Sequence, residues 1–325
     1  MPASPPPPAA NALGAIGNTP VVLLSQITPA EGHAKIYLKL ESLNPTGSYK
    51  DRLASSLLAS AEARGALRPG MTVLECTGGS TGSSLAYVCA ATKAEKQYTF
   101  HAVSSDAFAA EKLKTMRAFG AHLEIMPSRD GAIDAVLWGA MQDRTRELAR
   151  SPDVFFADQF NNPDCLAGYA SLGLELLAQF PDGIDGFCAA VGGASMAMGV
   201  SKVLRTSPSS ASKAVKVVVL EPASSPALTK GHGGTHGVEG IGSGARPPHL
   251  DDKLFDEAWA VEEAEARAMC RRLATEEGLL VGTSTGLNVV AAVKLAKELG
   301  EGKTVVTVAC DTGLKYLNSE LLAEA

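Results

Sequence analysis

The chain has 325 residues, of which 46% are hydrophobic and 5% aromatic, and its formal net charge is -6. This length and apolar content suffice for two domains with large cores. The 32 glycines and 18 prolines indicate many tight connections, as in an alternating α/β enzyme. Basic and acidic residues are interspersed, and no apolar run reaches bilayer length. The sequence therefore argues against a nucleic acid or a membrane as a partner.

Residues 1–11 are rich in proline and are predicted to form a disordered tail. The first basic residue is Lys35, so this segment has neither the arginines of a transit peptide nor the charged start of a secretion signal. The six cysteines form no CxxC pair, and no HxxxH or HExxH motif occurs. We therefore expect a cytoplasmic protein with buried free thiols and no metal site.

Strand-like runs alternate with helical patterns along most of the chain. The expected strands are Lys35–Leu40, Thr72–Glu75, Tyr98–Val103, His122–Met126, Gly186–Val191, Val215–Leu220 and Thr304–Ala309. The expected helices include Thr81–Ala91, Ala109–Phe119, Ile133–Arg150, Ala167–Gln179 and Glu262–Glu276. Such alternation predicts mostly parallel sheets covered by helices. We expect Thr72–Pro127 to form one small sheet and the strands from Gly186 onward a second, with a surface loop at Thr206–Lys213.

Lys50 stands between a turn-forming segment, Asn44–Ser48, and an apolar-periodic helix that contains Leu53 and Leu57. At the head of a helix the macrodipole disfavours a positive charge and stabilises an anion. This position suits an amine that acts as a neutral nucleophile beside a phosphate, as a Schiff base with pyridoxal 5′-phosphate requires. The alternative is a solvated surface lysine.

Three loops rich in Gly, Ser and Thr follow apolar strands and precede helices: Thr77–Gly82, Gly192–Ser195 and Gly282–Gly286. In a parallel sheet these junctions lie at the carboxyl edge, where free backbone N–H groups can bind phosphate or carboxylate oxygens. Each loop alone could be an ordinary turn with a hydroxyl N-cap. No loop matches GxxxxGK[ST], so a nucleotide is a weaker interpretation.

The motifs resemble those of the fold-type II pyridoxal-phosphate enzymes, in particular the cysteine synthase/cystathionine β-synthase family. The resemblance covers nearly the whole chain, through the blocks Gly17–Leu23, Lys39–Arg52, Gln159–Pro163, Glu239–Gly242 and Glu277–Gly286. It implies an α/β fold like that of the tryptophan synthase β-subunit, with two three-layer αβα domains and mostly parallel sheets. We expect a large cofactor-binding domain at 12–47 plus 156–325 and a small mobile domain at 48–155.

The resemblance also implies roles for particular residues. Lys50 would hold pyridoxal 5′-phosphate covalently and move the Cα proton of the substrate, which requires a lowered pKa. The other implied cofactor-binding residues are Ser80, Gly192, Gly193, Ala194, Ser195 and Ser284. The implied substrate-binding residues are Thr77, Gly78, Gly79, Ser80, Thr81, Gln159 and Gly240. Ser284 would face the pyridine nitrogen; judged alone, it could equally be a helix N-cap.

The implied reaction is β-replacement on O-acetyl-L-serine or a related activated serine through an aminoacrylate intermediate, with sulfide giving L-cysteine. Small amino-acid substrates and a homodimer are the expected partners. Two positions depart from the family pattern: Ser80 replaces a common asparagine, and Met196 replaces the threonine that commonly ends the phosphate turn. Ser80 therefore leaves open a different nucleophile, such as homocysteine or an amine. A non-catalytic scaffold is an alternative of another class.

Overall fold

The computed structural model describes residues 8–29, 31–129, 131, 135–206, 215–242, 244–319 and 321. Most of the predicted tail, residues 1–7, lies outside the described residues, as does the predicted surface loop from 207 onward. The chain becomes regular at η1 (Ala12–Ala15), where the Asn11 side chain accepts a hydrogen bond from the Leu13 N–H at 3.0 Å.

A six-stranded sheet has the order β1-β2-β10-β7-β8-β9 and is parallel except for the antiparallel edge strand β1. All residues of the inner strand β7 are buried. Because successive side chains of a strand point in opposite directions, both faces of the sheet are covered there. Phe187 belongs to one hydrophobic cluster, together with α6 and α7, and Cys188 to another, together with α8 and α9. The bounds are β1 (Val21–Leu23), β2 (Lys35–Lys39), β7 (Gly186–Ala190), β8 (Lys216–Pro222), β9 (Glu257–Val261), β10 (Thr304–Val308), α6 (Asp164–Gln179), α7 (Ser195–Thr206), α8 (Glu263–Glu277) and α9 (Thr283–Leu299).

A second sheet has four parallel strands in the order β5-β4-β3-β6. Helices α2 and α4 pack on one face and α5 on the other, where Leu137 and Met141 cover Leu74 and Val103. The bounds are β3 (Thr72–Cys76), β4 (Thr99–Ser105), β5 (His122–Met126), β6 (Val154–Phe156), α2 (Ser80–Ala91), α3 (Lys93–Lys96), α4 (Ala110–Ala118) and α5 (Ala135–Leu148).

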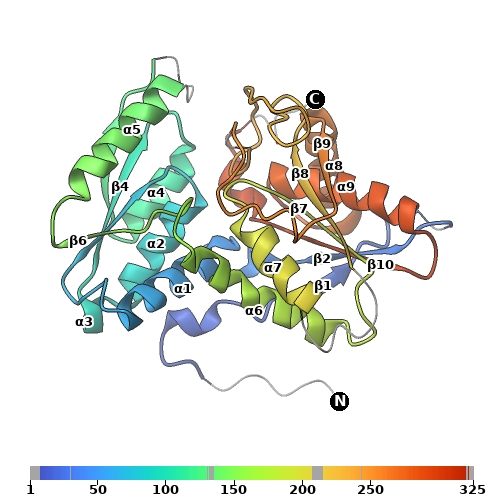
Figure 1. Ribbon diagram of the computed structural model, residues 1–325, viewed down its shortest axis with the longest axis horizontal. Helices are drawn as coiled ribbons and strands as arrows, with labels where there is room; N and C mark the ends of the chain where they lie inside the picture. The colour runs from blue at the N-terminus through green and yellow to red at the C-terminus, as the bar shows by residue number, and fades with distance from the viewer. Residues whose placement is uncertain are drawn as a thin grey trace.

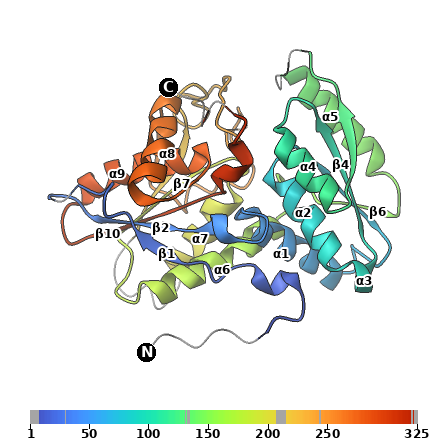
Figure 2. The ribbon, with the colours of Figure 1, turned by 180° about the vertical axis from the view of Figure 1, so that it is seen from behind.

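Helix α1 (Lys50–Ala63) lies between the two sheets and packs against α2 on one side and α6 on the other. Both ribbon views show the four-stranded sheet and the six-stranded sheet apart, with α1 and α6 running across between them (Figures 1 and 2). One hydrophobic cluster extends from α2 through α1 to α6 and β7, and includes Leu53, Leu57 and Tyr169. The amino end of α1, which carries Lys50, is therefore fixed by packing on both sides.

Every strand expected from the sequence is present, with ends that differ by at most two residues. The expected helices are present as well, although residue 133, the predicted start of one of them, lies outside the described residues. The prediction missed β1, β6 and β9, two of which have only three residues. It also assigned only the later strands to the second sheet, whereas β2 pairs with β10 inside it. None of the helices in the described residues combines the length and apolar character that a membrane crossing needs.

Candidate active site

A cavity opens to solvent where α1, β7 and α7 meet, and the space in and above it amounts to about 310 Å³. Its wall brings together six of the predicted site residues, which come from segments far apart in the sequence: Lys50, Gln159, Gly192, Gly193, Ala194 and Ser195. Tyr49 and Met196 complete much of the remaining wall. Tyr49 is buried and packs against Tyr169 with ring centroids 5.6 Å apart, so it belongs both to the cavity and to the core.

Lys50 is the first residue of α1, as the sequence predicted. Its Nζ lies 5.0 Å from the centroid of the Tyr49 ring. Burial of the amine lowers the pKa of Lys50, and the nearby Cys165 and Cys310 thiols oppose this shift only in part. Burial also raises the pKa of both thiols to about 12, so they remain neutral beside the amine. The lowered pKa has the direction that a lysine base near neutral pH requires.

The turn Gly192–Ser195 has the backbone of an anion-binding site. Ala194 has a φ of +64°, a left-handed conformation that is uncommon for a residue with a Cβ. A Cβ on Gly192 would lie 2.7 Å from the Gly240 carbonyl oxygen, so only glycine fits there. Among the described residues, no acceptor binds the N–H groups of Gly193, Ala194 or Ser195. These groups and the amino end of α7 therefore offer free donors and a favourable dipole to an anion.

The loop after β3 approaches the cavity through its hydroxyl groups. Thr81 Oγ1 donates to Gln159 Oε1 at 2.6 Å, which joins the four-stranded sheet to the cavity wall. The Gln159 N–H in turn donates to Glu75 Oε2 at 3.1 Å. Burial raises the pKa of Glu75 to about 8, although the backbone donors Gln159 and Cys76 oppose the shift. The buried Glu75 carboxyl thus holds the backbone of Gln159 in place.

Two of the three loops are shorter than the sequence suggested, because their helices begin earlier. Helix α2 begins at Ser80 and α9 at Thr283, with Gly79 and Gly282 as N-caps that supply no side-chain acceptor. The hydroxyl N-cap alternative is therefore wrong at both loops, including for Ser284. The first turns of both helices keep N–H groups without a capping side chain, as a ligand-binding turn requires.

Ser284 is buried in the first turn of α9, whose next residue, Thr285, accepts from the Cys310 N–H through Oγ1 at 3.0 Å. Asn288, one turn further along α9, holds this region together. Its Oδ1 accepts from the Ala190 N–H at 2.7 Å, and its Nδ2 donates to the Val308 carbonyl at 2.8 Å. Asn288 thus bridges β7 and β10 beyond the point where their own pairing ends, at Val306 and Phe187.

The family model described as "Pyridoxal-phosphate dependent enzyme" matches residues 12–311 of the chain. The chain belongs to this family. A cysteine synthase of Staphylococcus aureus is 37% identical over 316 residues, which cover 97% of both chains. An O-ureido-L-serine synthase of Streptomyces lavendulae is 37% identical over 311 residues, or 95% of this chain and 91% of that protein. Isoform 3 of O-acetyl serine sulfhydrylase from Entamoeba histolytica has a similar structure, with a TM-score of 0.90, 30% identity and coverage of 100% of this chain and 95% of its own.

The cavity fits pyridoxal 5′-phosphate on its own geometry. The strained turn with unbound N–H groups suits the phosphate, and an amine with a lowered pKa lies in the same cavity. Thr77, Gly78, Gly79, Ser80, Gly240 and Ser284 do not line this cavity; Gly240 packs behind the turn, and Gly78 packs against the Phe108 ring. Arg246 is half-exposed, and its guanidinium pairs with Asp252 at 2.7 Å, as is usual for an arginine on the surface. Within the described residues, no three His, Cys, Asp or Glu side chains are grouped as metal ligands.

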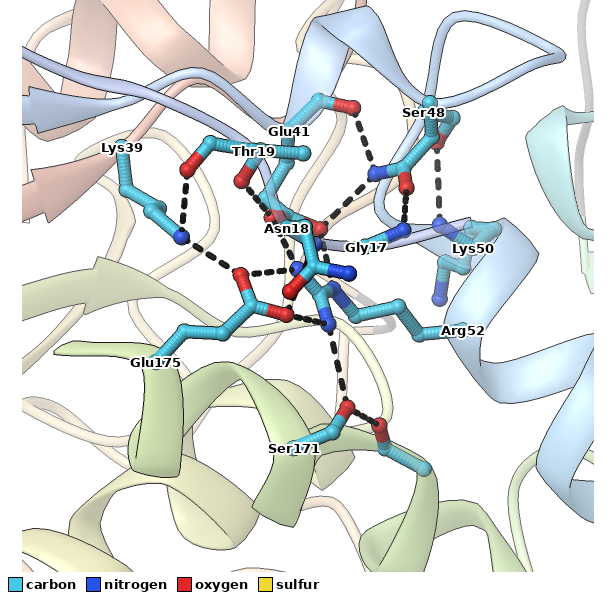
Figure 3. Close-up of polar contacts among 12 residues, drawn as sticks. Gly17, Asn18, Thr19, Lys39, Glu41, Ser48, Lys50, Arg52, Ser171 and Glu175 are labelled. Carbon is cyan, nitrogen blue, oxygen red and sulfur yellow. Dashed lines mark hydrogen bonds and ion pairs between the residues drawn. The ribbon is translucent and has the colours of Figure 1, made fainter. Parts of the chain in front are cut away.

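Beneath Lys50 lies a buried network of four charged side chains that sequence analysis did not assign (Figure 3). Arg52 donates to both carboxylate oxygens of Glu41, at 2.7 and 2.8 Å, and to both of Glu175, at 2.8 Å each. Lys39 completes the network with an ion pair to Glu175 at 2.6 Å. Since Arg52 belongs to α1, Glu41 to the η2 turn (Glu41–Leu43), Lys39 to β2 and Glu175 to α6, this network stabilises the first turn of α1 against the six-stranded sheet. The charged residues at 39, 41, 50 and 52, in the patterns KxE and KxR, were the only sign of this network in the sequence.

Proposed function

We propose that the protein catalyses β-replacement on an activated L-serine, with O-acetyl-L-serine as donor and sulfide as acceptor, to give L-cysteine and acetate. The observation that carries this proposal is the shared cavity of the Lys50 amine and the Gly192–Ser195 turn. The names of the similar proteins, cysteine synthase and O-acetyl serine sulfhydrylase, support the same substrates.

In this proposal Gly192, Gly193, Ala194 and Ser195 hold the phosphate of the cofactor through backbone N–H groups, and Ser284 faces its ring nitrogen. Bound pyridoxal 5′-phosphate supplies the electron sink for cleavage of the Cα–H bond. Lys50 Nζ removes the Cα proton, and burial lowers the pKa of its amine, the direction that this role requires.

The amino acid is held by its carboxylate in the same proposal. The loop Thr77–Gly79 and the first turn of α2, with Ser80 and Thr81, offer N–H and hydroxyl donors at a helix amino end. Gln159 reaches the same carboxylate, supported by its contact with Thr81. Gly240, which has a φ of +85°, places its carbonyl oxygen behind Gly192 of the phosphate turn. We propose that the four-stranded sheet and its helices α2, α4 and α5, within the region 48–155, close over the bound substrate and exclude water.

A second acceptor remains a candidate because of Ser80. Its Oγ is already engaged, since it accepts from Lys315 Nζ at 3.1 Å and donates to Asp311 Oδ2 at 3.3 Å. A substrate turn with a serine at position 80 differs from one with an asparagine at that position. A similar protein is named for a different product, O-ureido-L-serine. Incubating the holoenzyme and O-acetyl-L-serine with sulfide, homocysteine or hydroxyurea, and identifying products by mass spectrometry, separates the two. Turnover with sulfide alone excludes the second acceptor.

Reduction with borohydride followed by peptide mapping tests the covalent site directly. We expect the reduced cofactor on the peptide that contains Lys50, and no adduct in Lys50→Ala, whose circular dichroism should match the wild type. Lys216→Ala, which removes a partly exposed lysine from β8, is the matched control and should keep the adduct. An adduct on another lysine would contradict the proposal, and a yellow protein that shows no spectral change with O-acetyl-L-serine would favour the scaffold alternative.

We further propose a homodimer in the cytoplasm. The six cysteines are all buried and unpaired, as expected in a reducing compartment. Sedimentation velocity of the holoenzyme tests the assembly, and a monomer at micromolar concentration would contradict it.

A further inference from the structure

The segment Cys310–Thr312, directly after β10, contacts two of the proposed site segments through its backbone. The Cys310 carbonyl accepts from the Tyr49 N–H at 3.0 Å, and the Thr312 N–H donates to the Gly47 carbonyl at 3.0 Å. On its other side, the Asp311 carbonyl accepts from the Gly282 N–H at 3.2 Å. One short segment therefore fixes both the Lys50 turn and the Ser284 turn.

The Asp311 side chain adds a third contact, which crosses to the four-stranded sheet. Its carboxylate is 5% exposed, and Oδ2 accepts from Ser80 Oγ at 3.3 Å and from Tyr316 Oη at 2.7 Å. Lys315, also buried, donates to the same Ser80 hydroxyl at 3.1 Å. The other oxygen, Oδ1, has no hydrogen-bond partner among the described residues. It lies so close to Gly282 that a Cβ there would be 2.3 Å away.

A second contact reinforces this junction from α4. Lys112 donates to Tyr316 Oη at 3.3 Å, lies over the Tyr316 ring at 4.4 Å from its centroid, and pairs with Glu239. Lys112 and Ser80 both belong to the four-stranded sheet and its helices, whereas Tyr316 and Asp311 follow the six-stranded sheet. A buried carboxylate with one oxygen left without a hydrogen bond costs folding free energy.

We propose that Asp311 is a positioning residue that holds the first turn of α2, through Ser80, against the Lys50 and Ser284 segments. This inference rests on the proposed function, in which that turn binds the substrate carboxylate. The N–H groups of the turn bind an anion well only when their direction is fixed, because helix-end donors are directional. Asp311 acts through Ser80 and touches neither the substrate nor the cofactor.

Steady-state kinetics of the holoenzyme Asp311→Asn variant test the proposal. The substitution is nearly isosteric but removes the charge that accepts two hydroxyl bonds. We expect KM for the activated serine to rise about tenfold, with kcat changed less than about threefold, because a charge-assisted hydrogen bond is lost at the substrate turn only. In the cofactor-free protein we expect faster hydrogen exchange at residues 77–82.

Glu221→Gln is the matched control, because Glu221 is a buried acid of the six-stranded sheet whose carboxylate binds the Leu228 and Thr229 N–H groups. It should change neither KM nor exchange at 77–82. Ser80→Ala should raise KM like Asp311→Asn. The double variant should be no worse than either alone, since both substitutions act on the same Ser80–Asp311 hydrogen bond.

Unchanged KM and exchange in Asp311→Asn, equal effects in Glu221→Gln, or additive effects in the double variant would each overturn the positioning role. If Asp311→Asn does not fold, hydrogen exchange at residues 77–82 in Ser80→Ala decides, because that measurement involves no bound substrate. A wild-type protein that does not turn over any activated serine contradicts the proposed function instead, and the exchange experiment still tests Asp311.

Discussion

The two polar clusters beside the cavity differ in how completely their charges are partnered. In the network beneath Lys50, Arg52 forms four hydrogen bonds of 2.7–2.8 Å to two carboxylates, and Thr19 and Asn44 bind Glu41 at 2.6 and 2.8 Å. At the junction around Asp311, the bonds to Ser80 are 3.1 and 3.3 Å long, and one carboxylate oxygen has no partner among the described residues.

This difference in hydrogen bonding corresponds to a difference in the elements that each cluster joins. The network joins β2, α1 and α6. Helices α1 and α6 already share one hydrophobic cluster, against which Tyr37 of β2 packs, so the short bidentate bonds join elements that do not move apart. The junction joins elements that follow different sheets, and its two bonds to Ser80, at 3.1 and 3.3 Å, can be broken at lower cost. We infer that the lysine is held rigidly, while the substrate turn is held by contacts that can open and reform.

Replacing Arg52 should have the largest effect on stability. Arg52→Met leaves Glu41 buried without its charge partner, and we expect the free energy of unfolding to fall by about 3–5 kcal/mol. Arg52→Lys keeps the charge but loses the forked geometry, so its effect should be intermediate. Urea denaturation of the cofactor-free protein measures both. Lys315→Met, the matched change at the junction, should lower the free energy of unfolding by only about 1–2 kcal/mol. Equal losses in Arg52→Met and Lys315→Met would show that the two clusters do not differ in this way.

Acid should weaken the network through Glu175. Although burial opposes it, hydrogen bonds from Arg52 and Lys39 lower the pKa of Glu175 to about 2, from a usual value of 4.5. A carboxyl with a lowered folded-state pKa stabilises the fold above its unfolded pKa, and this stability is lost as the pH falls from about 5 to 2. We expect about 2 kcal/mol of acid-sensitive stability from this group, measured by urea denaturation across that range.

Glu175→Gln should remove that part of the pH dependence, so that its unfolding free energy falls less steeply between pH 5 and 3 than in the wild type. An unchanged acid limb in Glu175→Gln would show that other carboxyls carry it.

The sequence predicted the elements and the cavity wall better than the contacts that support them. Strands such as His122–Met126 could be predicted because alternation and buried runs are local signals. Lys50 and the Gly192 turn could be found because their chemistry depends on backbone position at a strand or helix end. Asp311 and Arg52 could not, since their roles arise from partners 231 and 123 residues away in sequence. The helix starts at Ser80 and Thr283 were misplaced because glycine N-caps carry no side-chain signal.

The smallest expected effect comes from crowding the junction at Gly282. In Gly282→Ala the new Cβ would lie 2.3 Å from Asp311 Oδ1 and 2.6 Å from Tyr316 Cε2, so one side of the junction must shift. Because the bonds to Ser80 are long, we expect the junction to open there at a cost of about 1 kcal/mol, near the low end for overpacking. Urea denaturation measures the cost, and faster hydrogen exchange at residues 77–82 should accompany it.

Gly79→Ala is the matched control for this change, since Gly79 is also a glycine N-cap and nothing lies within 4 Å of its Cβ position. It should cost about 0.5 kcal/mol, the N-cap effect alone. A loss in Gly282→Ala as large as that of Arg52→Met would mean that the junction is as rigid as the network. The substrate turn would then have to bind its ligand without moving, and the flexibility inferred for it would be wrong.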